Sequence, residues 1–473
     1  MSREAAVARV LAAFDEGTWR AETARLVAIP TESQRPERRE ALERYLTEGV
    51  GPLFERLGYT LERHENPTGG GPVLLAERDE GAPLTVLSYG HGDVIRGQEG
   101  RWSDGMDPWT VEERDGRLYG RGVVDNKGQH LAQLMAVEAV VAERGRLGVN
   151  HRFVIEMGEE NGSAGFREVV EARRARFDAD VFFASDGPRT EIGRPNVTLG
   201  NRGVLNFDLV CRFREGGHHS GNWGGLLANP AVVLANAIAA ICDGRGRVRV
   251  PGWDTGPAPA PVRRALRGVR REAGPSAPAI DPDWGAEGLS DIERVTAVPT
   301  FEVLAMTAGD PARPVNAIPP EARAACQLRF VTPLTKAEVL PALRAHLDAS
   351  GFARVEIAPP DPANAIAFEA TRTDPDHPFA AWMRAAVDRA PWDRTEGERC
   401  AVLPNSGGSN VTEVMQHVLG MPTVWLPLSY AGCRQHAPDE HVPLALMREG
   451  LGILASIWWD LGDPETGYRK EGA

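Results

Sequence analysis

The chain has 473 residues, of which 42% are hydrophobic and 25% charged, and its formal net charge is −13. This length allows two domains of ordinary size, and the negative charge argues against nucleic acid and anionic membrane as partners. Five widely spaced cysteines without a CxxC pair argue against a disulfide framework or a cysteine-rich zinc site, and favour a location in the reducing cytoplasm. We expect neither a membrane span nor a signal peptide, and residues 1–17 are typical of a surface helix.

The first part of the chain predicts helices that alternate with strands. Residues 1–75 look helical and amphipathic, for example at 40–57. Apolar runs within 84–94, 151–160 and 178–187 predict buried strands that each run into a loop, and residues 128–142 have helical periodicity. This alternation predicts an α/β fold with a doubly wound, mostly parallel sheet. Ligands of such sheets collect beyond the carboxyl ends of the strands, and all three predicted strand ends carry acidic residues or histidine.

The pattern changes after residue 203. The next predicted elements follow a βαββαβ order, with strands at 204–213, 298–306, 321–331 and 353–358 and helices at 226–242 and 336–349. We therefore expect an inserted α+β domain at 204–365, and a catalytic domain formed by 1–203 and 366–473. A helix at 377–390 and a strand at 421–429 would rejoin the catalytic domain.

A stretch rich in glycine, proline and arginine interrupts the inserted domain at 243–283. It contains Trp253, and Trp284 follows it directly. The stretch could cap a pocket or form a surface loop, and we favour the surface loop.

The first candidate chemical groups follow two of the predicted strands. His91 and Asp93 have the i, i+2 spacing that points two side chains to one face. A histidine that binds a metal usually donates its other nitrogen to a carboxylate or carbonyl, which Asp93 could supply. The adjacent acids Glu159 and Glu160 repel each other unless a cation lies near them. With a metal present, one carboxylate would bind it and the other would take the proton from metal-bound water.

Three further groups complete the pattern: Asp125 in GRGVVDNKG, Asp186 in SDG and His436 in QHAPDEH. The glycine loop does not fit the phosphate-loop pattern, whereas a loop carboxylate can bridge two metal ions through its two oxygens. Taken singly, each residue is more typical of a turn or loop. Together, two histidines and three carboxylates without thiolates predict a catalytic site for zinc, with manganese or cobalt as alternatives.

The motifs HGDV, LYGRGVVDNKG, GEENGS, SDG, HHSGNWGG and HAPDE occur in an order that resembles the co-catalytic zinc peptidase family. That family includes carnosinase-like dipeptidases, aminoacylases, glutamate carboxypeptidases and succinyl-diaminopimelate desuccinylases. The segment RWSDGMDPWTVEERDGRLYGRG is most similar to the dipeptidase branch. The resemblance implies metal-dependent hydrolysis of an amide bond in a small substrate such as a dipeptide. An N-acyl- or N-carbamoyl-amino-acid amidohydrolase and a non-catalytic metal-binding relative are the alternatives.

The resemblance also implies a role for each residue at the metal centre. His91 and Asp186 would hold one metal ion, Glu160 and His436 the other, and Asp125 would bridge the two together with a water or hydroxide. Glu159 would be the general base and later the proton donor to the leaving amine, and Asp93 would orient His91. The peptide bond between Asp125 and Asn126 is expected to be cis.

In the same comparison, the inserted domain resembles a lid that also forms a homodimer. His219 would reach the active site of the partner subunit and stabilise the oxyanion. Arg329 would bind a substrate carboxylate, and Asn316 and Gly407-Gly408-Ser409 would line the substrate pocket.

The sequence departs from the family pattern at three places. The glycine before the acidic pair is displaced by one position, with Met157 in its usual place. Gly217 and Asn410 replace an acidic and an apolar residue, respectively, near the expected substrate. These last two changes bear on substrate specificity.

Overall fold

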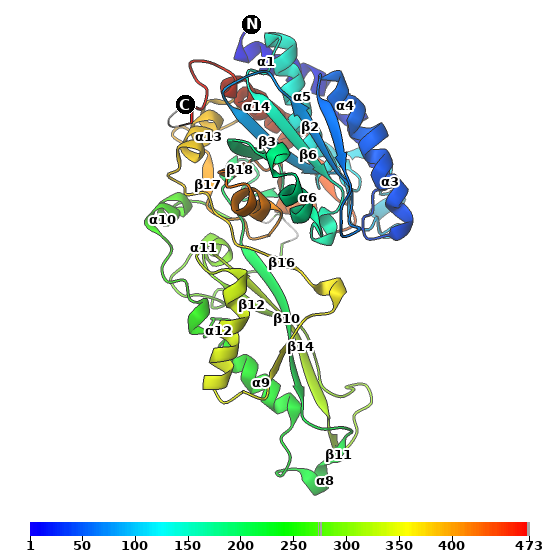
Figure 1. Cartoon of the computed structure of the whole chain (residues 1–473), viewed down its shortest axis with the longest axis vertical. Helices are drawn as coiled ribbons and strands as arrows, with labels where there is room; N and C mark the ends of the chain where they lie inside the picture. Colours follow the sequence, from blue (N-terminus) through cyan, green and yellow to red (C-terminus); the bar gives the residue numbers. More distant parts are fainter. Residues whose placement is uncertain (273, 275–276, 471–473) are drawn as a thin grey trace.

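The computed structural model describes residues 1–272, 274 and 277–470. The chain forms an α/β body that carries both termini and a long arm that extends from it (Figure 1). No helix in the described part of the chain is long and apolar enough to cross a membrane. The five cysteines, all of which the structure describes, are free thiols.

An eight-stranded sheet forms the centre of the body. In spatial order its strands are β1 (Thr60–His64), β2 (Val73–Arg78), β6 (Asn150–Glu156), β3 (Thr85–His91), β7 (Val181–Ala184), β18 (Thr423–Trp425), β9 (Asn196–Thr198) and β17 (Ala401–Leu403). β3 runs parallel to β6 and β7, and β18 runs parallel to β7. The predicted mostly parallel sheet is therefore confirmed.

The beginning of the chain differs from its prediction. The helical pattern over residues 40–57 is confirmed by a continuous helical run made of α3 (Arg39–Arg44), a π-helix (Tyr45–Val50) and α4 (Gly51–Arg56). The purely helical interpretation of residues 1–75 is wrong at its end, because β1 and the start of β2 lie there and form an antiparallel edge. β1 alternates weakly and has one buried residue, His64, so its sequence gives little strand signal.

Helices cover both faces of the sheet, because side chains of each central strand alternate between two cores. On β6, Phe153 and Ile155 enter one core and Val154 enters the other. The first core is covered by α1 (Arg3–Asp15), α2 (Thr18–Val27), α5 (Lys127–Arg144), α13 (Pro378–Arg389) and α14 (Leu444–Leu461). The second is covered by α6 (Phe166–Ala172), α7 (Arg174–Phe177) and a π-helix (Val414–Val418).

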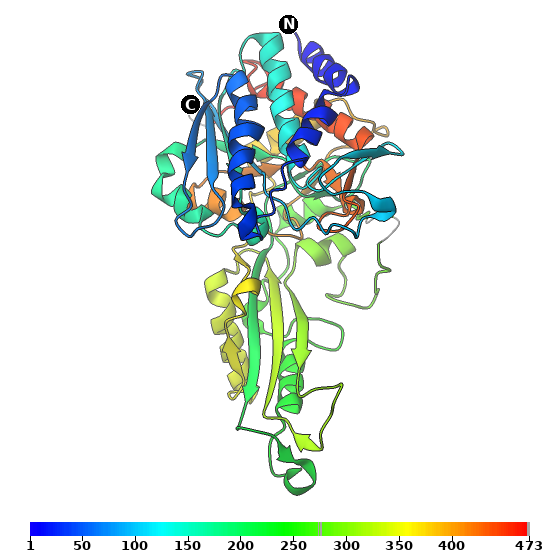
Figure 2. The same ribbon diagram turned by 90° about the vertical axis from the view of Figure 1, so that its right-hand side faces the viewer.

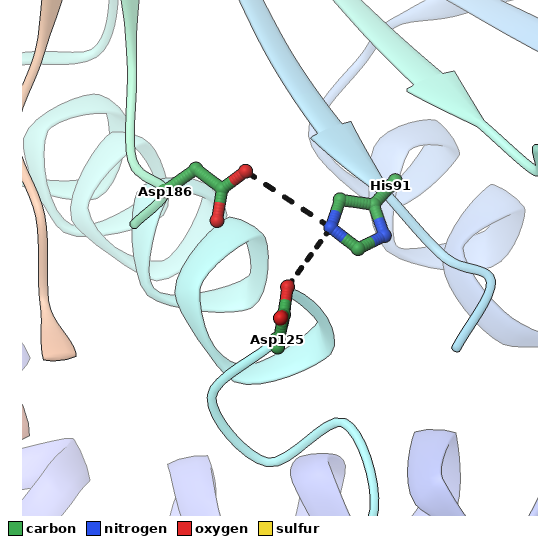
Figure 3. Close-up of side chains that lie close together, drawn as sticks. All are labelled: His91, Asp125 and Asp186. Carbon is green, nitrogen blue, oxygen red and sulfur yellow. Dashed lines mark hydrogen bonds and ion pairs between the residues drawn. The ribbon is translucent and has the colours of Figure 1, made fainter. Parts of the chain in front are cut away.

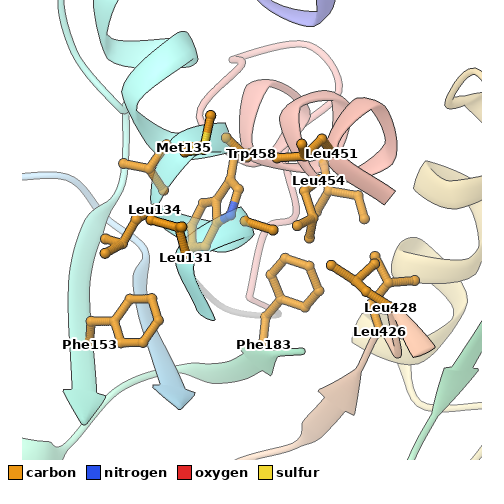
Figure 4. Close-up of a cluster of buried hydrophobic side chains, with 14 of the residues drawn as sticks. Leu131, Leu134, Met135, Phe153, Phe183, Leu426, Leu428, Leu451, Leu454 and Trp458 are labelled. Atoms are coloured by element: carbon orange, nitrogen blue, oxygen red, sulfur yellow. The ribbon is translucent and has the colours of Figure 1, made fainter. Parts of the chain in front are cut away.

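The first core joins α5 and α14 to the sheet (Figure 4). Trp458 of α14 is fully buried there, near Phe183 of β7. Its indole Nε1 donates to Gln133 Oε1 of α5 at 2.8 Å, which satisfies the polar atom of an otherwise apolar contact. This packing fixes α5, and with it the loop that precedes α5, against the central strands.

The arm is built on a second, antiparallel sheet with long strands (Figure 2). Its order is β12 (Thr300–Thr307), β14 (Glu321–Phe330), β10 (Gly203–Arg212) and β15 (Glu356–Ala358), and β16 (Ala367–Phe368) also pairs with β10. α9 (Pro230–Ile241) and α12 (Lys336–Ala349) cover one face of it. The chain order is the predicted βαββαβ. At the far end of the arm lie β11 (His218–His219), β13 (Ala317–Ile318) and α8 (Ser220–Trp223).

The stretch at 243–283 divides between the arm and the body. Trp253 is fully buried in the arm, where its Nε1 donates to Val339 O of α12 at 2.9 Å. After it the chain crosses to the body, where α10 (Ala260–Leu266) packs against β17, and α11 (Asp291–Thr296) follows. The interpretation as a surface loop is therefore wrong for these parts of the stretch, because they are packed against both domains.

Candidate metal centre and substrate pocket

The candidate site lies where three neighbouring strands of the body end. β6, β3 and β7 are adjacent and parallel, so their carboxyl ends meet at one edge. His91 is the last residue of β3, Glu159 and Glu160 follow β6, and Asp186 follows β7. Asp125 lies in the loop before α5, and His436 lies in a loop after β18. The fold thus brings together residues from five chain segments.

Three of these residues form the first group of possible metal ligands: His91, Asp125 and Asp186 (Figure 3). His91 Nε2 lies 3.1 Å from Asp125 Oδ1 and 4.0 Å from Asp186 Oδ2. His91 is buried, and its Nδ1 faces the carbonyl oxygen of Asp93 at 3.1 Å and Asp93 Oδ1 at 3.5 Å. Asp93 thus lies where a group that orients His91 is expected.

The second group consists of Asp125, Glu160 and His436. His436 Nε2 lies 3.1 Å from Asp125 Oδ2 and 3.1 Å from Glu160 Oε2. Asp125 therefore turns one oxygen to each histidine, which is the arrangement that a bridging carboxylate requires. The peptide bond from Asp125 to Asn126 is cis, as the resemblance implied.

The carboxylate of Asp93 has a second function that its spacing from His91 did not reveal. Its Oδ1 accepts a hydrogen bond from the backbone N–H of Glu159 at 3.2 Å, and its Oδ2 accepts from that of Glu160 at 3.1 Å. Asp93 therefore joins the end of β3 to the short helical turn at Glu159–Asn161. Asp93 thus contacts the His91 imidazole through its backbone carbonyl and the acidic pair through its carboxylate.

The charges of the site favour a bound cation. Burial and the nearby Asp125 raise the pKa of Glu160 to about 7, and they also raise the pKa of Asp186. Burial raises the pKa of Glu159 well above its usual range. Hydrogen bonds with Asp125 and Glu160 raise the pKa of His436 to about 11. Crowded carboxylates around two imidazole nitrogens repel one another, and divalent cations between them would relieve that repulsion. The donor set, with nitrogen and oxygen and no sulfur, fits zinc, manganese or cobalt.

Glu440 is a site residue that the sequence did not single out. It is fully buried, and its Oε2 accepts from Arg121 Nη1 at 2.7 Å. Its Oε1 accepts from the backbone N–H groups of Gly122, Val124 and Asp125 at 3.1–3.2 Å. The side chain thus holds the loop that presents Asp125. Its place in the motif HAPDE was the available signal, but only the fold shows what it contacts.

A pocket of about 470 Å³ opens beside the two ligand groups. Asp125, Glu159, Asp186 and His436 line it on one side. Gly407, Gly408 and Ser409 also line this pocket. Arg329 of β14 reaches this loop, because its Nη1 donates to Ser409 Oγ at 3.1 Å. A guanidinium therefore lies next to the pocket, where it can bind a carboxylate.

Arg202, also missed in the sequence, fixes the same loop. Its Nε and Nη2 both donate to Gly407 O at 3.1 Å, and its Nη1 donates to Thr300 Oγ1 at 3.1 Å. Burial and the nearby Arg329 lower the pKa of Arg202 to about 10. Two arginines thus meet where the arm joins the body.

His219 and Asn316 lie elsewhere. His219 pairs with Ala317 at the far tip of the arm, and Asn316 O accepts from the backbone N–H of Ser220 at 2.9 Å. Both views place this tip away from the body (Figures 1 and 2). Within one chain, the structure brings these two residues to each other and not to the ligand groups.

Comparisons with known proteins agree with this architecture. The sequence profile of peptidase family M20/M25/M40 matches residues 87–460. Human Beta-Ala-His dipeptidase is 39% identical over 186 residues, which span 38% of this chain and 36% of that protein. A cysteinylglycine-S-conjugate dipeptidase of Corynebacterium striatum is 34% identical over 208 residues, which span 44% of this chain and 45% of that protein. The matched segments thus span less than half the length of these curated relatives.

Two solved structures share the fold. An M20 family metallo-carboxypeptidase from Sulfolobus solfataricus has a TM-score of 0.75 at 23% identity, covering 93% of this chain and 98% of its own. Human carnosine dipeptidase 1 has a TM-score of 0.73 at 23% identity, and the match covers 96% of this chain and 98% of that chain. At such identities these structures show the fold alone.

The doubly wound sheet, the two ligand groups at its carboxyl edge and the inserted arm define a metallopeptidase-type α/β protein. The chain belongs to peptidase family M20/M25/M40, whose profile matches most of its length. The resemblance seen in its motifs is thereby confirmed. Members of this family use divalent metal ions, and the two ligand groups are the place in this chain that could hold them.

Proposed function

We propose that the protein is a metal-dependent hydrolase that cleaves the amide bond of a dipeptide or a similarly small peptide. The observation that carries the proposal is the position of Asp125 between His91 and His436, with Glu159 beside it in the same pocket. Two divalent ions, zinc in our assignment, would be held by His91 and Asp186 and by Glu160 and His436, with Asp125 between them. When bound, such ions polarise a carbonyl and lower the pKa of water.

The chain's own groups then have distinct tasks. Glu159 accepts the proton of the attacking water and returns it to the leaving amine, a task for which its carboxylate in the pocket is placed. Asp93 keeps His91 and the Glu159 backbone in place. Arg329, together with Gly407, Gly408 and Ser409, binds the substrate carboxylate.

The choice of a dipeptide is supported by the relatives, two of which carry dipeptidase names. A panel of dipeptides and N-acetyl amino acids, tested on chelated protein reloaded with zinc, manganese or cobalt, checks both the substrate and the metal. Glu159→Gln should abolish turnover while the metal content, measured by mass spectrometry, stays at two ions per chain. Turnover at the wild-type rate in this variant would refute the role of Glu159.

We further propose that a second copy of the chain completes the site through the arm. His219 would donate to the developing oxyanion in the partner's site, with Asn316 beside it. The exposed side chains near His219 support such a contact, since Trp223 is 44% exposed and Leu226 is 77% exposed. The domains at 1–203 with 366–473, and at 204–365, would then be the catalytic and the lid and dimerisation domains.

Mixed dimers test this arrangement. Glu159→Gln and His219→Ala should each be inactive alone. In a mixture refolded or exchanged at equal amounts, one of the two sites in each hybrid dimer regains both groups, so about a quarter of the wild-type activity should return. No recovery, with hybrid dimers present by native mass spectrometry, would refute the contribution of His219 from a partner chain.

A further inference from the structure

The segment that crosses from the arm to the body packs beside the substrate pocket. The described residues of the range 254–299, which are 254–272, 274 and 277–299, leave the arm after Trp253 and return to it at β12. Their apolar side chains form a separate small core with the edge strand β17 of the body. This core contains Val262, Leu266, Val269, Ile292, Ala297, Ala401 and Leu403. The crossing segment is therefore a packed part of the body surface next to the metal centre.

Five residues around this core form one side of the pocket, here termed the apolar wall: Thr198, Ile292, Val295, Thr296 and Leu403. The two threonines are almost fully buried, and each hydroxyl makes a hydrogen bond within the protein. Thr198 Oγ1 accepts from Asn196 Nδ2 at 3.1 Å, and Thr296 Oγ1 donates to Ile292 O at 2.7 Å. The apolar wall thus presents carbon to the pocket, and a charged group placed against it would lose its hydration without compensation.

The apolar wall continues directly into the loop that we assign to substrate binding. A Cβ atom on Gly407 would lie 2.8 Å from Val295 Cγ1, so Val295 of α11 presses against that loop. Val295 is only partly buried, whereas Ile292 is 4% exposed and Thr296 is 2% exposed. Val295 is therefore the member of the apolar wall whose side chain a ligand can contact without rearrangement.

We propose that the apolar wall selects substrates with an aliphatic side chain, which packs on Val295 between the metal centre and the Gly407 loop. This inference rests on the proposed amide hydrolysis and names its substrate class: small peptides that carry alanine, valine or leucine on one side of the scissile bond. Polar and charged residues also line the pocket, among them Asn201, Arg271 and Gln435. Aspartate or lysine at the selected position is disfavoured because its charge meets the apolar wall.

The test uses the zinc-loaded full-length protein with two dipeptide series, glycyl-Xaa and Xaa-glycine, where Xaa is alanine, valine, leucine, aspartate or lysine. In one of the two series, kcat/KM should rise by up to roughly fourfold for each buried methylene and fall at least tenfold for the charged residues. Val295→Thr, which replaces a methyl group by a hydroxyl at equal size, should lower the leucine-to-alanine ratio by roughly threefold to tenfold. Val295→Ala should lower the same ratio and serves as the second variant.

The matched control is Ile280→Thr, which lies on the same crossing segment, is 53% exposed and does not line the pocket. It should leave both series unchanged. Binding of the same dipeptides to the Glu159→Gln variant, measured by calorimetry with and without Val295→Thr, separates recognition from turnover. If the dipeptide affinities depend on Val295 but neither the wild-type protein nor any variant hydrolyses a dipeptide, the proposed function is refuted and the role of the apolar wall in binding is supported. If Val295→Thr changes neither the kcat/KM values nor the affinities across the two dipeptide series, the proposal that the apolar wall selects the substrate is refuted.

Discussion

Removal of the Glu440 side chain should destabilise the protein and disturb the metal centre together. Glu440 and Arg121 are each about 1% exposed, so they form a buried ion pair. Breaking such a pair from one side leaves an unpaired buried charge and costs roughly 3–5 kcal/mol. Glu440→Ala also removes the acceptor for the backbone N–H groups of Gly122, Val124 and Asp125.

The two contributions can be separated by the choice of substitution. Glu440→Gln keeps an oxygen that accepts from the three backbone N–H groups, but it turns an amide donor towards the Arg121 guanidinium. This variant therefore loses the ion pair with Arg121 and keeps the hydrogen bonds to the loop that presents Asp125. Glu440→Ala loses both. Each buried N–H without a partner costs roughly 1–3 kcal/mol, although losses within one network do not add. We therefore expect roughly 3 kcal/mol for Glu440→Gln and roughly 4–6 kcal/mol for Glu440→Ala.

Urea unfolding followed by circular dichroism, in chelated and in zinc-loaded protein, measures these losses. Metal affinity should fall further in Glu440→Ala than in Glu440→Gln, because only the alanine variant frees the loop that presents Asp125. The surface pair of Asp15 with Arg448 supplies the control, and Asp15→Asn should leave the midpoint unchanged within error. A Glu440→Ala protein that unfolds at the wild-type urea concentration would contradict the whole argument.

Three further predictions concern other parts of the molecule. Burial, with a smaller contribution from Arg78, lowers the pKa of His151 from 6.5 to about 3. The neutral His151 side chain therefore contributes fully to the free energy of unfolding above pH 6.5, and roughly 4–5 kcal/mol of that free energy is lost as the pH falls towards 3. His151→Gln should make the urea midpoint fall less steeply between pH 7 and pH 5. Chelation should lower the thermal midpoint, and zinc at a thousandfold excess over its Kd should restore about 4 kcal/mol, measured by calorimetry; an unchanged midpoint would contradict metal binding by the two ligand groups. Arg202→Lys cannot span Gly407 O and Thr300 Oγ1 together, so KM should rise several-fold with kcat nearly unchanged in steady-state kinetics. An unchanged KM would show that Arg202 does not position the loop.

Sequence periodicity predicted the central strands well because they are largely buried. β3, β6 and β7 form short apolar runs, and a polar residue lies at the end of β3 and β6 and directly after β7. α12 occupies the predicted range 336–349, since a Thr335 capping box marks its start. β1 was missed because an exposed edge strand carries charged residues that suit a helix equally well. The domain boundaries at 203 and 365 remain predictions.

The candidate ligands could be named from motifs, but their supporting residues could not. Asp93 was assigned to His91 from its spacing, whereas its bonds to the Glu159 and Glu160 backbone depend on β3 and β6 being neighbours. Glu440 contacts a loop that lies more than three hundred residues earlier in the chain. Local sequence gives no signal for such a pairing, because the contact is created by the packing of distant elements and not by periodicity.

The role of the Asn410 departure also became clear only in three dimensions. Its Oδ1 accepts from the backbone N–H of Thr412 at 3.0 Å, so the residue caps the helical turn that follows the Gly407 loop. An apolar residue at this position could not make that bond. The change therefore stabilises the helical turn that follows the pocket loop.

The junction between arm and body lies beside the pocket loop and the apolar wall. Arg202, which immediately precedes β10, joins Gly407 of the pocket loop to Thr300 at the start of β12, and Val295 presses on Gly407 from the end of α11. β12 and β10 belong to the sheet of the arm, and a separate two-stranded sheet that contains His219 lies at the far tip. The apolar wall packs against β17 of the body, whereas Arg202 ties the pocket loop to the first residue of β12 in the arm. In the proposed dimer, one inserted segment would therefore supply a wall to its own site and a histidine to the partner's site.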